Sequence, residues 1–156
     1  MELDKFDRQI LGYLQLEGDL PAAQIAERIG LSTNACWRRI KRLEETGVIR
    51  KRVALLDEAS LGLGVTVFVG IKTNEHNDKW LKSFANGIKE IPEVVEFYRM
   101  SGDTDYLLQI VVRDIADYDR VYKKIIAVTP LHDVSSSFAM ERIKSSTALP
   151  LSHLDI

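Results

Sequence analysis

Apolar residues recur at helical spacing in three short segments of the first fifty residues. The first segment begins after Asp4, a favourable N-cap, and ends near Gly18. Its apolar positions fall on one face of a helix, at Leu3, Phe6, Ile10 and Leu14. This spacing predicts one amphipathic helix.

The second and third segments predict two more helices separated by a tight turn. Pro21 suits the first turn of the second helix, which ends at Gly30. Ser32 then caps a third helix that runs to about Thr46. Residues 48–57 follow as an extended, basic segment, which we interpret as a linker strand.

The third predicted helix has one apolar and one basic face. Cys36, Ile40 and Leu43 cluster on one side of a helical wheel. The opposite side, which we expect to be free, carries Asn34, Arg38, Lys41, Arg42 and Glu45. A helix, a turn and a second helix with a basic outer face form the helix-turn-helix arrangement, whose second helix enters the major groove of DNA.

Residues 63–144 contain a faint internal duplication. Each half has a strand, an amphipathic helix, a dipeptide ending in proline and a second strand. The four predicted strands are 65–72, 94–100, 106–113 and 134–140. Two such units in tandem predict a βαββαβ, ferredoxin-like domain, with one antiparallel sheet and both helices on one face. The whole chain is therefore predicted to be of the α+β class.

The other face of this sheet is also apolar. In the first strand Val65, Val67, Val69 and Ile71 alternate with Thr66, Phe68 and Gly70. A second copy of the chain is the simplest cover for that face, so we expect at least a homodimer.

Composition and charge agree with a folded DNA-binding protein. The 156 residues are 46% hydrophobic and 28% charged, which excludes a disordered or fibrous chain. The net charge of -2 conceals a basic stretch at residues 38–52, which holds seven cations and two anions. Such a stretch suits a polyanion, although a solvated helix face would look the same.

Few residues in the sequence point to metal binding or catalysis. Cys36 is the only cysteine and is expected to be a buried hydrophobic residue, and the three histidines, His76, His132 and His153, lack metal-ligand spacing. We predict no metal, no cofactor and no catalytic site. The charged N-terminus and the short apolar runs favour a cytoplasmic, nucleoid-associated protein and no membrane segment.

Four segments together resemble the Lrp/AsnC family of transcription regulators. They are LDKFDRQIL (3–11), QIAERIGLS (24–32), RRIKRLEETGVI (38–49) and SGDTDYLL (101–108). The resemblance implies a helix-turn-helix domain at 1–52, a linker at 53–62, an effector-binding RAM domain at 63–144 and a tail at 145–156. It also implies homodimers that assemble into a tetramer or octamer, and the segment around Cys36-Trp37 resembles a subgroup that responds to small amino acids or cysteine.

The resemblance places the base-reading and phosphate-contacting positions at Thr33, Asn34, Trp37, Arg38, Lys41 and Arg42. Asn34 is suited to pair with adenine and Arg38 with guanine. Lys41 and Arg42, with Arg50, Lys51 and Arg52 beyond the helix, are expected to contact phosphates of double-stranded DNA. For Trp37 a second interpretation stays open, in which its ring seals the edge of the three-helix core.

The loop 101–105, which we expect to join the two central strands, has two interpretations. It is a hairpin connection built from turn-forming residues, or it binds an amino acid. In the second case a glycine-containing loop offers N–H donors to the carboxylate, and Asp103 or Asp105 accepts from the ammonium.

Resemblance to the family favours the effector site. It implies a pocket completed by the segment before the last strand of a neighbouring subunit, here 132–137. The predicted effector residues are Met100, Ser101, Gly102, Asp103, Thr104, Asp105, Tyr106, Asp133, Val134, Ser135, Ser136 and Ser137. Because no arginine or lysine lies between Met100 and Tyr106, we expect an uncharged amino acid such as leucine or methionine.

Two other functions remain possible from the sequence. Sirohaem decarboxylases share this architecture, although the cations kept on the third helix argue against such an enzyme. A regulator that wraps DNA without any effector is the other alternative.

Overall fold

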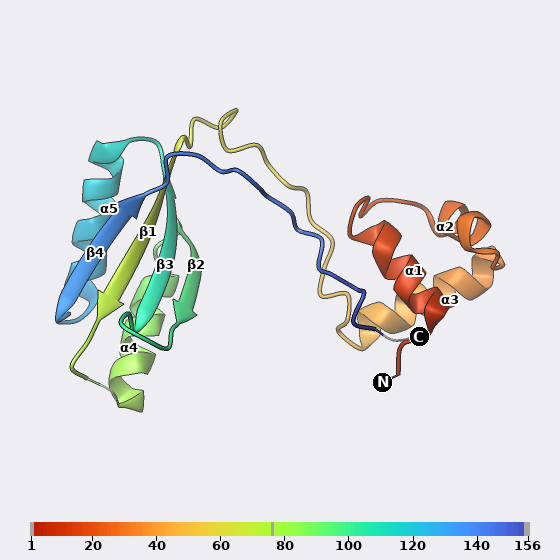
Figure 1. Ribbon diagram of the computed structural model, residues 1–156, viewed down its shortest axis with the longest axis horizontal. Helices are drawn as coiled ribbons and strands as arrows, with labels where there is room; N and C mark the ends of the chain where they lie inside the picture. The colour runs from red at the N-terminus through yellow and green to blue at the C-terminus, as the bar shows by residue number, and fades with distance from the viewer. Residues whose placement is uncertain (1, 76, 155–156) are drawn as a thin grey trace. The chain divides into compact units, whose positions relative to one another are not determined.

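The chain divides into two compact units in the computed structural model, which describes residues 2–75 and 77–154 (Figure 1). One unit contains the residues up to Leu55 and those from Ile143 onward. The other spans Leu56–Arg142. We describe each unit by itself.

The first unit is built on the three predicted helices, α1 (Lys5–Leu14), α2 (Ala22–Ile29) and α3 (Thr33–Glu45). Asp4 caps α1, and its carboxylate accepts from the Asp7 N–H at 2.9 Å while the Asp7 carboxylate accepts from the Asp4 N–H at 3.1 Å. Ser32 caps α3 by accepting from the Ala35 N–H at 3.2 Å. The predicted helix starts are thus confirmed to within a residue.

The helices close on one small apolar core. Its fully buried side chains include Ile10, Ile25, Cys36 and Leu43, each with about 0% exposure. Burial of each large aliphatic side chain stabilises the fold by about 1.5–3 kcal/mol, so the relative orientation of the helices is set mainly here. Cys36 lies in this core as expected, and its burial raises the pKa of the thiol.

The expected linker strand is not found. In the described part of the chain, the backbone of residues 51–56 joins no strand ladder and makes no backbone–backbone hydrogen bond. Its alternating residues are exposed on both sides, so no sheet face stabilises a strand there.

The second unit has the predicted βαββαβ order. Its elements are β1 (Val65–Lys72), α4 (Asp78–Lys89), β2 (Val94–Arg99), β3 (Tyr106–Val112), α5 (Ile115–Val128) and β4 (Asp133–Phe138). The sheet is antiparallel, in the order β2-β3-β1-β4, with β1 and β3 in the centre. Val69 of β1 lies opposite Leu108 of β3 and Ser136 of β4, which fixes the register.

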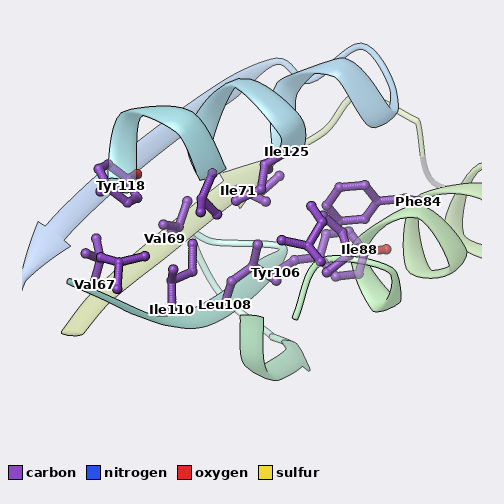
Figure 2. Packing of buried hydrophobic residues seen from close by; sticks show 13 residues of the cluster. Val67, Val69, Ile71, Phe84, Ile88, Tyr106, Leu108, Ile110, Tyr118 and Ile125 are labelled. Atoms are coloured by element: carbon purple, nitrogen blue, oxygen red, sulfur yellow. The ribbon is translucent and has the colours of Figure 1, made fainter. Parts of the chain in front are cut away.

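Both helices cover the same face of this sheet (Figure 1). Figure 2 shows Val67, Val69 and Ile71 of β1 directed into the core between sheet and helices, where all three are 0% exposed. On the other face Phe68 is 38% exposed and Tyr98 is 49% exposed. The alternation predicted from the sequence is confirmed, and one apolar face stays open in the single chain.

The last residues pack against α1 within the first unit. The Gln15 side-chain amide donates to the Leu149 carbonyl at 3.0 Å and accepts from the Leu149 N–H at 2.9 Å. Arg8 donates to the Leu154 carbonyl at 3.2 Å. Among the described residues, no helix is long and apolar enough to cross a membrane.

Candidate DNA-binding and effector-binding sites

The N-terminal half of α3 presents polar side chains to solvent. Thr33, Asn34, Arg38 and Lys41 are all exposed, while Cys36 and Ile40 on the same helix are buried. Core packing therefore fixes the rotation of α3 and leaves these four side chains on its outer side. This arrangement suits insertion into a groove of DNA.

Trp37 lies on the surface rather than in the core. Its side chain is 52% exposed, and the Lys41 Nζ lies 5.3 Å from the centre of its ring. The ring borders a shallow hollow of about 410 Å³ that Leu20 and Pro21 also line. The ring of Trp37 is therefore accessible to a ligand from this hollow.

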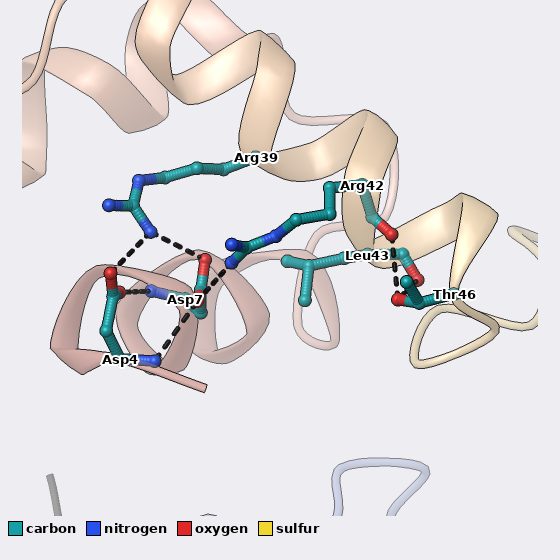
Figure 3. A network of polar contacts seen from close by, with 6 residues as sticks. All are labelled: Asp4, Asp7, Arg39, Arg42, Leu43 and Thr46. Atoms are coloured by element: carbon teal, nitrogen blue, oxygen red, sulfur yellow. Dashed lines mark hydrogen bonds and ion pairs between the residues drawn. The ribbon is translucent and has the colours of Figure 1, made fainter. Parts of the chain in front are cut away.

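Arg42 does not lie free on the basic face, and that expectation is wrong. Its Nη2 donates to Asp7 Oδ2 of α1 at 2.5 Å (Figure 3). Arg39, its neighbour on α3, donates from Nη1 to Asp7 Oδ1 at 2.9 Å and to Asp4 Oδ2 at 2.7 Å. The reason is that Asp7 is completely buried, so its charge requires cationic partners within reach.

These contacts affect the ionisation of both partners. Partial burial of Asp4 acts to raise its pKa, but hydrogen bonds from the Asp7 N–H and from Arg39 bring the pKa below its usual range. Burial acts to lower the pKa of Arg39, and its hydrogen bonds to Asp4 and Asp7 raise it overall. The shifted pKa values of Asp4 and Arg39 both favour the charged forms of these two side chains.

Arg52 is also occupied within the chain. Its guanidinium donates to Glu44 Oε1 at 2.8 Å and to the Gly18 carbonyl at 3.1 Å, joining the end of α3 to the turn after α1. Arg50 and Lys51 are exposed, and neither makes an ion pair or side-chain hydrogen bond in the described part of the chain. Of the three cations beyond α3, these two remain available to phosphates.

The loop 101–105 joins β2 to β3, so it connects an edge strand to a central strand rather than two central strands. The Met100 N–H donates to the Asp105 carbonyl at 2.8 Å and closes the loop. Ser101, Gly102 and Asp103 are exposed at its tip. Gly102 has φ +120°, which side chains rarely tolerate, and open space surrounds it, so glycine is required by backbone conformation and not by crowding.

Asp105 anchors the loop to the sheet. Its Oδ2 accepts from the Thr73 N–H at 2.8 Å, and its own N–H donates to the Ile71 carbonyl at 3.0 Å. The loop therefore has the structural role that the hairpin interpretation assigned to it, and Asp103 is the more available of the two carboxylates.

Tyr106 packs mainly into the core of the second unit. It is 5% exposed, and its ring centre lies 5.7 Å from those of Trp80 and Phe84 and 5.8 Å from that of Phe97. The pleat explains this result, because Tyr106 falls in register with Leu108 and Ile110 on the helix-covered face.

The predicted segment 133–137 is β4 itself, not a segment before the last strand. Its residues divide between the two faces of the sheet. Val134 packs against the core, and the Ser136 hydroxyl is hydrogen-bonded to the Tyr118 hydroxyl. The remaining three, Asp133, Ser135 and Ser137, pair with Lys72, Gly70 and Phe68 on the open face.

Thr104 and Ser135 meet over Gly70 on that open face. A Cβ at position 70 would lie 3.0 Å from the Ser135 Oγ and 3.4 Å from the Thr104 Cγ2. Gly70 thus permits the loop and β4 to approach one another within a single chain. Sequence reasoning had assigned the two sides of this site to different subunits.

A small hollow of about 80 Å³ lies on the other side of the loop. Met100, Asp105 and Tyr106 line it, together with four residues that the sequence had not indicated: Asn77, Asp78, Leu81 and Arg99. Arg99 ends β2 and is exposed, while Asn77 and Asp78 begin α4. The cation directly before the loop was the signal that could have identified this hollow.

Comparisons with known proteins identify both units. A winged helix-turn-helix DNA-binding profile matches residues 3–50, and the profile of the Lrp/AsnC ligand binding domain matches residues 66–149. The chain belongs to the Lrp/AsnC family of regulators. It is a DNA-binding transcription regulator whose second unit is an Lrp/AsnC ligand-binding domain.

Individual Lrp/AsnC relatives match almost the full chain. A glutamate uptake regulatory protein of Zymomonas mobilis is 52% identical over 150 residues, 96% of this chain and 92% of that protein. The crystal structure of an AsnC family transcriptional regulator from Agrobacterium tumefaciens is 56% identical, with a TM-score of 0.93 over 97% of this chain and 99% of that one. A transcriptional regulator from Neisseria meningitidis, in complex with L-methionine, is 36% identical, with a TM-score of 0.92 and coverage of 97% and 99%.

These relatives are regulators, so the chain is not assigned to the sirohaem decarboxylases and no enzymatic activity is attributed to it. The described residues hold no cluster of three or more His, Cys, Asp or Glu side chains that could bind a metal ion. His76 lies outside the described residues.

Proposed function

We propose that this Lrp/AsnC regulator binds specific DNA sequences in the cytoplasm, on the nucleoid, and responds to a small uncharged amino acid, methionine or leucine. The L-methionine complex of the Neisseria meningitidis regulator, which is 36% identical over nearly the full chain, is the observation that carries the choice of ligand. The chain offers a matching set of groups beside the loop 101–105.

An amino acid needs a cation for its carboxylate and an anion for its ammonium group. Arg99 and Asp78 supply this pair at the hollow, and Asn77 adds an amide. Asp103 stands exposed at the nearby loop tip. Met100, 42% exposed, and Leu81 give the apolar contacts that a methionine or leucine side chain prefers.

A second copy of the chain would complete this site. The hollow of about 80 Å³ admits only a few water molecules, which is too little for a whole amino acid. The open sheet face, with Phe68 and Tyr98 exposed, supplies a surface for that copy. We therefore propose a homodimer that assembles further, to a tetramer or an octamer.

On the DNA side, Thr33, Asn34, Trp37 and Arg38 are proposed to contact base edges. Lys41, Arg50 and Lys51 are proposed to contact phosphates. Under this division Arg38→Ala relaxes sequence discrimination, while Lys51→Ala weakens binding to every duplex about equally. Gel shifts with a selected and a random duplex test it, and equal loss of specificity in both variants would contradict the division.

A thermal-shift screen of the twenty amino acids on the full chain tests the effector. Methionine or leucine should raise the Tm, since a ligand that binds only the folded state stabilises it by RT ln(1 + [L]/Kd). Arg99→Gln should abolish that shift, whereas Lys79→Gln, an exposed cation on α4 outside the hollow, should retain it.

Three results would overturn this choice of ligand. A shift with glutamate alone would mean that Arg99 binds a side-chain carboxylate. A shift that survives Arg99→Gln would place the site elsewhere. No shift with any amino acid would favour the regulator that acts on DNA without an effector.

A further inference from the structure

The first turn of α1 holds two cations of the DNA-binding helix. Asp7 is 0% exposed, and its two carboxylate oxygens accept from two different guanidinium groups, those of Arg39 and Arg42 (Figure 3). Both arginines are carried by α3, the helix that presents Arg38 and Asn34 to solvent. The network therefore connects a buried anion directly to the DNA-binding surface.

The position of Arg42 on α3 is one from which it could reach DNA if Asp7 did not hold it. It lies one turn beyond Arg38, at a spacing that puts both side chains on the same side of the helix. Its side chain is still 44% exposed despite the pairing with Asp7. Released from Asp7, the Arg42 guanidinium would stand beside Arg38 and within reach of the same DNA backbone.

Cations that contact phosphates raise affinity for all sequences alike. Each neutralised phosphate adds about 0.9 to the slope of log K against log salt and strengthens non-specific binding. Discrimination depends on the ratio of specific to non-specific affinity, so an extra phosphate contact that every duplex offers gives no discrimination. Keeping such cations from the DNA therefore lowers the affinity for every duplex and leaves that ratio unchanged.

We propose that Asp7 withholds Arg39 and Arg42 from DNA phosphates and so limits sequence-independent binding. This rests on the proposed placement of α3 in the groove of DNA. Asp7 acts through the two arginines and is a positioning residue, not a DNA contact.

The decisive variant is Asp7→Asn, which keeps the size of the side chain and removes its charge. Binding to a labelled duplex of random sequence is measured by fluorescence anisotropy over a range of salt concentrations. We expect Asp7→Asn to bind this duplex several-fold more tightly at low salt, with a slope steeper by about 1 to 2. A merely structural role predicts weaker binding and a slope that is unchanged or shallower.

Two further variants control this experiment. Asp7→Asn combined with Arg42→Gln should return the slope most of the way to the wild-type value, because the freed cation is gone. Asp117→Asn removes a similar carboxylate that holds Arg113 and Arg120 in the other unit, and it should leave the slope unchanged. A steeper slope in Asp117→Asn would point to a general charge effect and overturn the proposal.

A comparison in the otherwise wild-type chain covers the case in which Asp7→Asn does not fold. Lys51→Gln should lower the salt slope by about 0.9, and Arg42→Gln should lower it by clearly less. Equal reductions would show that Arg42 already contacts phosphate and would refute the proposal.

A selection of sequences from a randomised DNA pool with the wild-type chain distinguishes a failure of this proposal from a failure of the proposed sequence-specific DNA binding. If the wild type enriches a sequence, Asp7→Asn should bind the selected and the random duplex more tightly by about the same factor. If it enriches none, sequence specificity itself is refuted, and the slopes on random DNA still decide whether Asp7 withholds cations.

Discussion

The first turns of α1 and α5 share one four-residue pattern, an aspartate at the N-cap and another three residues later. Asp4 accepts from the Asp7 N–H at 2.9 Å, and Asp114 accepts from the Asp117 N–H at 2.7 Å. In both helices the second aspartate is buried and binds two arginines. Up to this point the two helix starts are built alike.

They differ in where the arginines come from. Asp117 binds Arg113 and Arg120, which lie four residues before it and three after it. Asp7 binds Arg39 and Arg42, 32 and 35 residues further along the chain. The arginines of Asp117 are thus its neighbours in sequence, although Arg120 also donates to Glu93 ahead of β2. Those of Asp7 come from α3 and tie α1 to that helix.

Removing each buried carboxylate gives the largest expected contrast. Asp7→Ala should destabilise the first unit by about 3 kcal/mol, because it deletes charged hydrogen bonds and leaves two guanidinium groups without their anion. Asp117→Ala should cost the second unit less, because its arginines are more exposed, at 67% and 47%. Urea unfolding followed by fluorescence reports each unit separately, since Trp37 lies in one and Trp80 in the other. Equal losses would mean that the origin of the arginines is irrelevant.

Removing one cation from each network sharpens the comparison. Arg39→Gln should cost about 2 kcal/mol, because the Arg39 side chain is only 26% exposed and bridges Asp4 and Asp7. The effect of Arg120→Gln should be smaller and should fade in 1 M salt, since exposed ion pairs are screened. Unfolding of both variants at about 0.1 M and 1 M NaCl measures this. If the free-energy cost of Arg39→Gln also fell at high salt, the ion pairs of Arg39 would be shown to be exposed to solvent.

The sequence patterns predicted those features of the fold that depend on residues only a few positions apart in the chain. The caps at Asp4 and Ser32 and the alternation along β1 gave the elements and their inward faces, because each signal lies within a few residues of the structure it causes. The basic residues of α3 were found, but their partners were not. Which carboxylate neutralises Arg42 depends on how α1 packs against α3, and no short-range pattern encodes that.

In the loop 101–105, too, the local features were predicted and the contacts with residues distant in the chain were not. Its glycine and aspartates were correctly placed between two strands, yet Asp105 is engaged by the backbone of Thr73, 32 residues away. Tyr106 turned inward because the register of β3 decides its face. Arg99 was not predicted because it belongs to β2 and its place beside Asn77 and Asp78 depends on how α4 packs.

Acid should weaken the start of α5 by a smaller effect. Hydrogen bonds from Arg120 and Arg113 lower the pKa of Asp117 from 3.8 to about 2. Because the folded-state pKa is the lower one, this carboxylate stabilises the second unit above about pH 4, and the contribution is lost as the pH falls toward 2. Trp80-detected unfolding should show this loss in the wild type and a flatter profile in Asp117→Asn. Identical profiles would contradict the assigned shift.

The smallest expected effect concerns the other long-range contact of α1. Gln15 makes two hydrogen bonds to the backbone of Leu149, at 3.0 Å and 2.9 Å, and thereby binds an extended segment as a neighbouring strand would. Both bonds are exposed, so Gln15→Ala should destabilise the first unit by about 1 kcal/mol or less. The tail should nevertheless become more accessible to carboxypeptidase, because its main polar anchor on α1 is lost. Gln109→Ala, which removes a glutamine on the open sheet face, is the matched control and should leave tail cleavage unchanged. Wild-type cleavage rates in Gln15→Ala would show that Arg8 and apolar contacts hold the tail on α1 without Gln15.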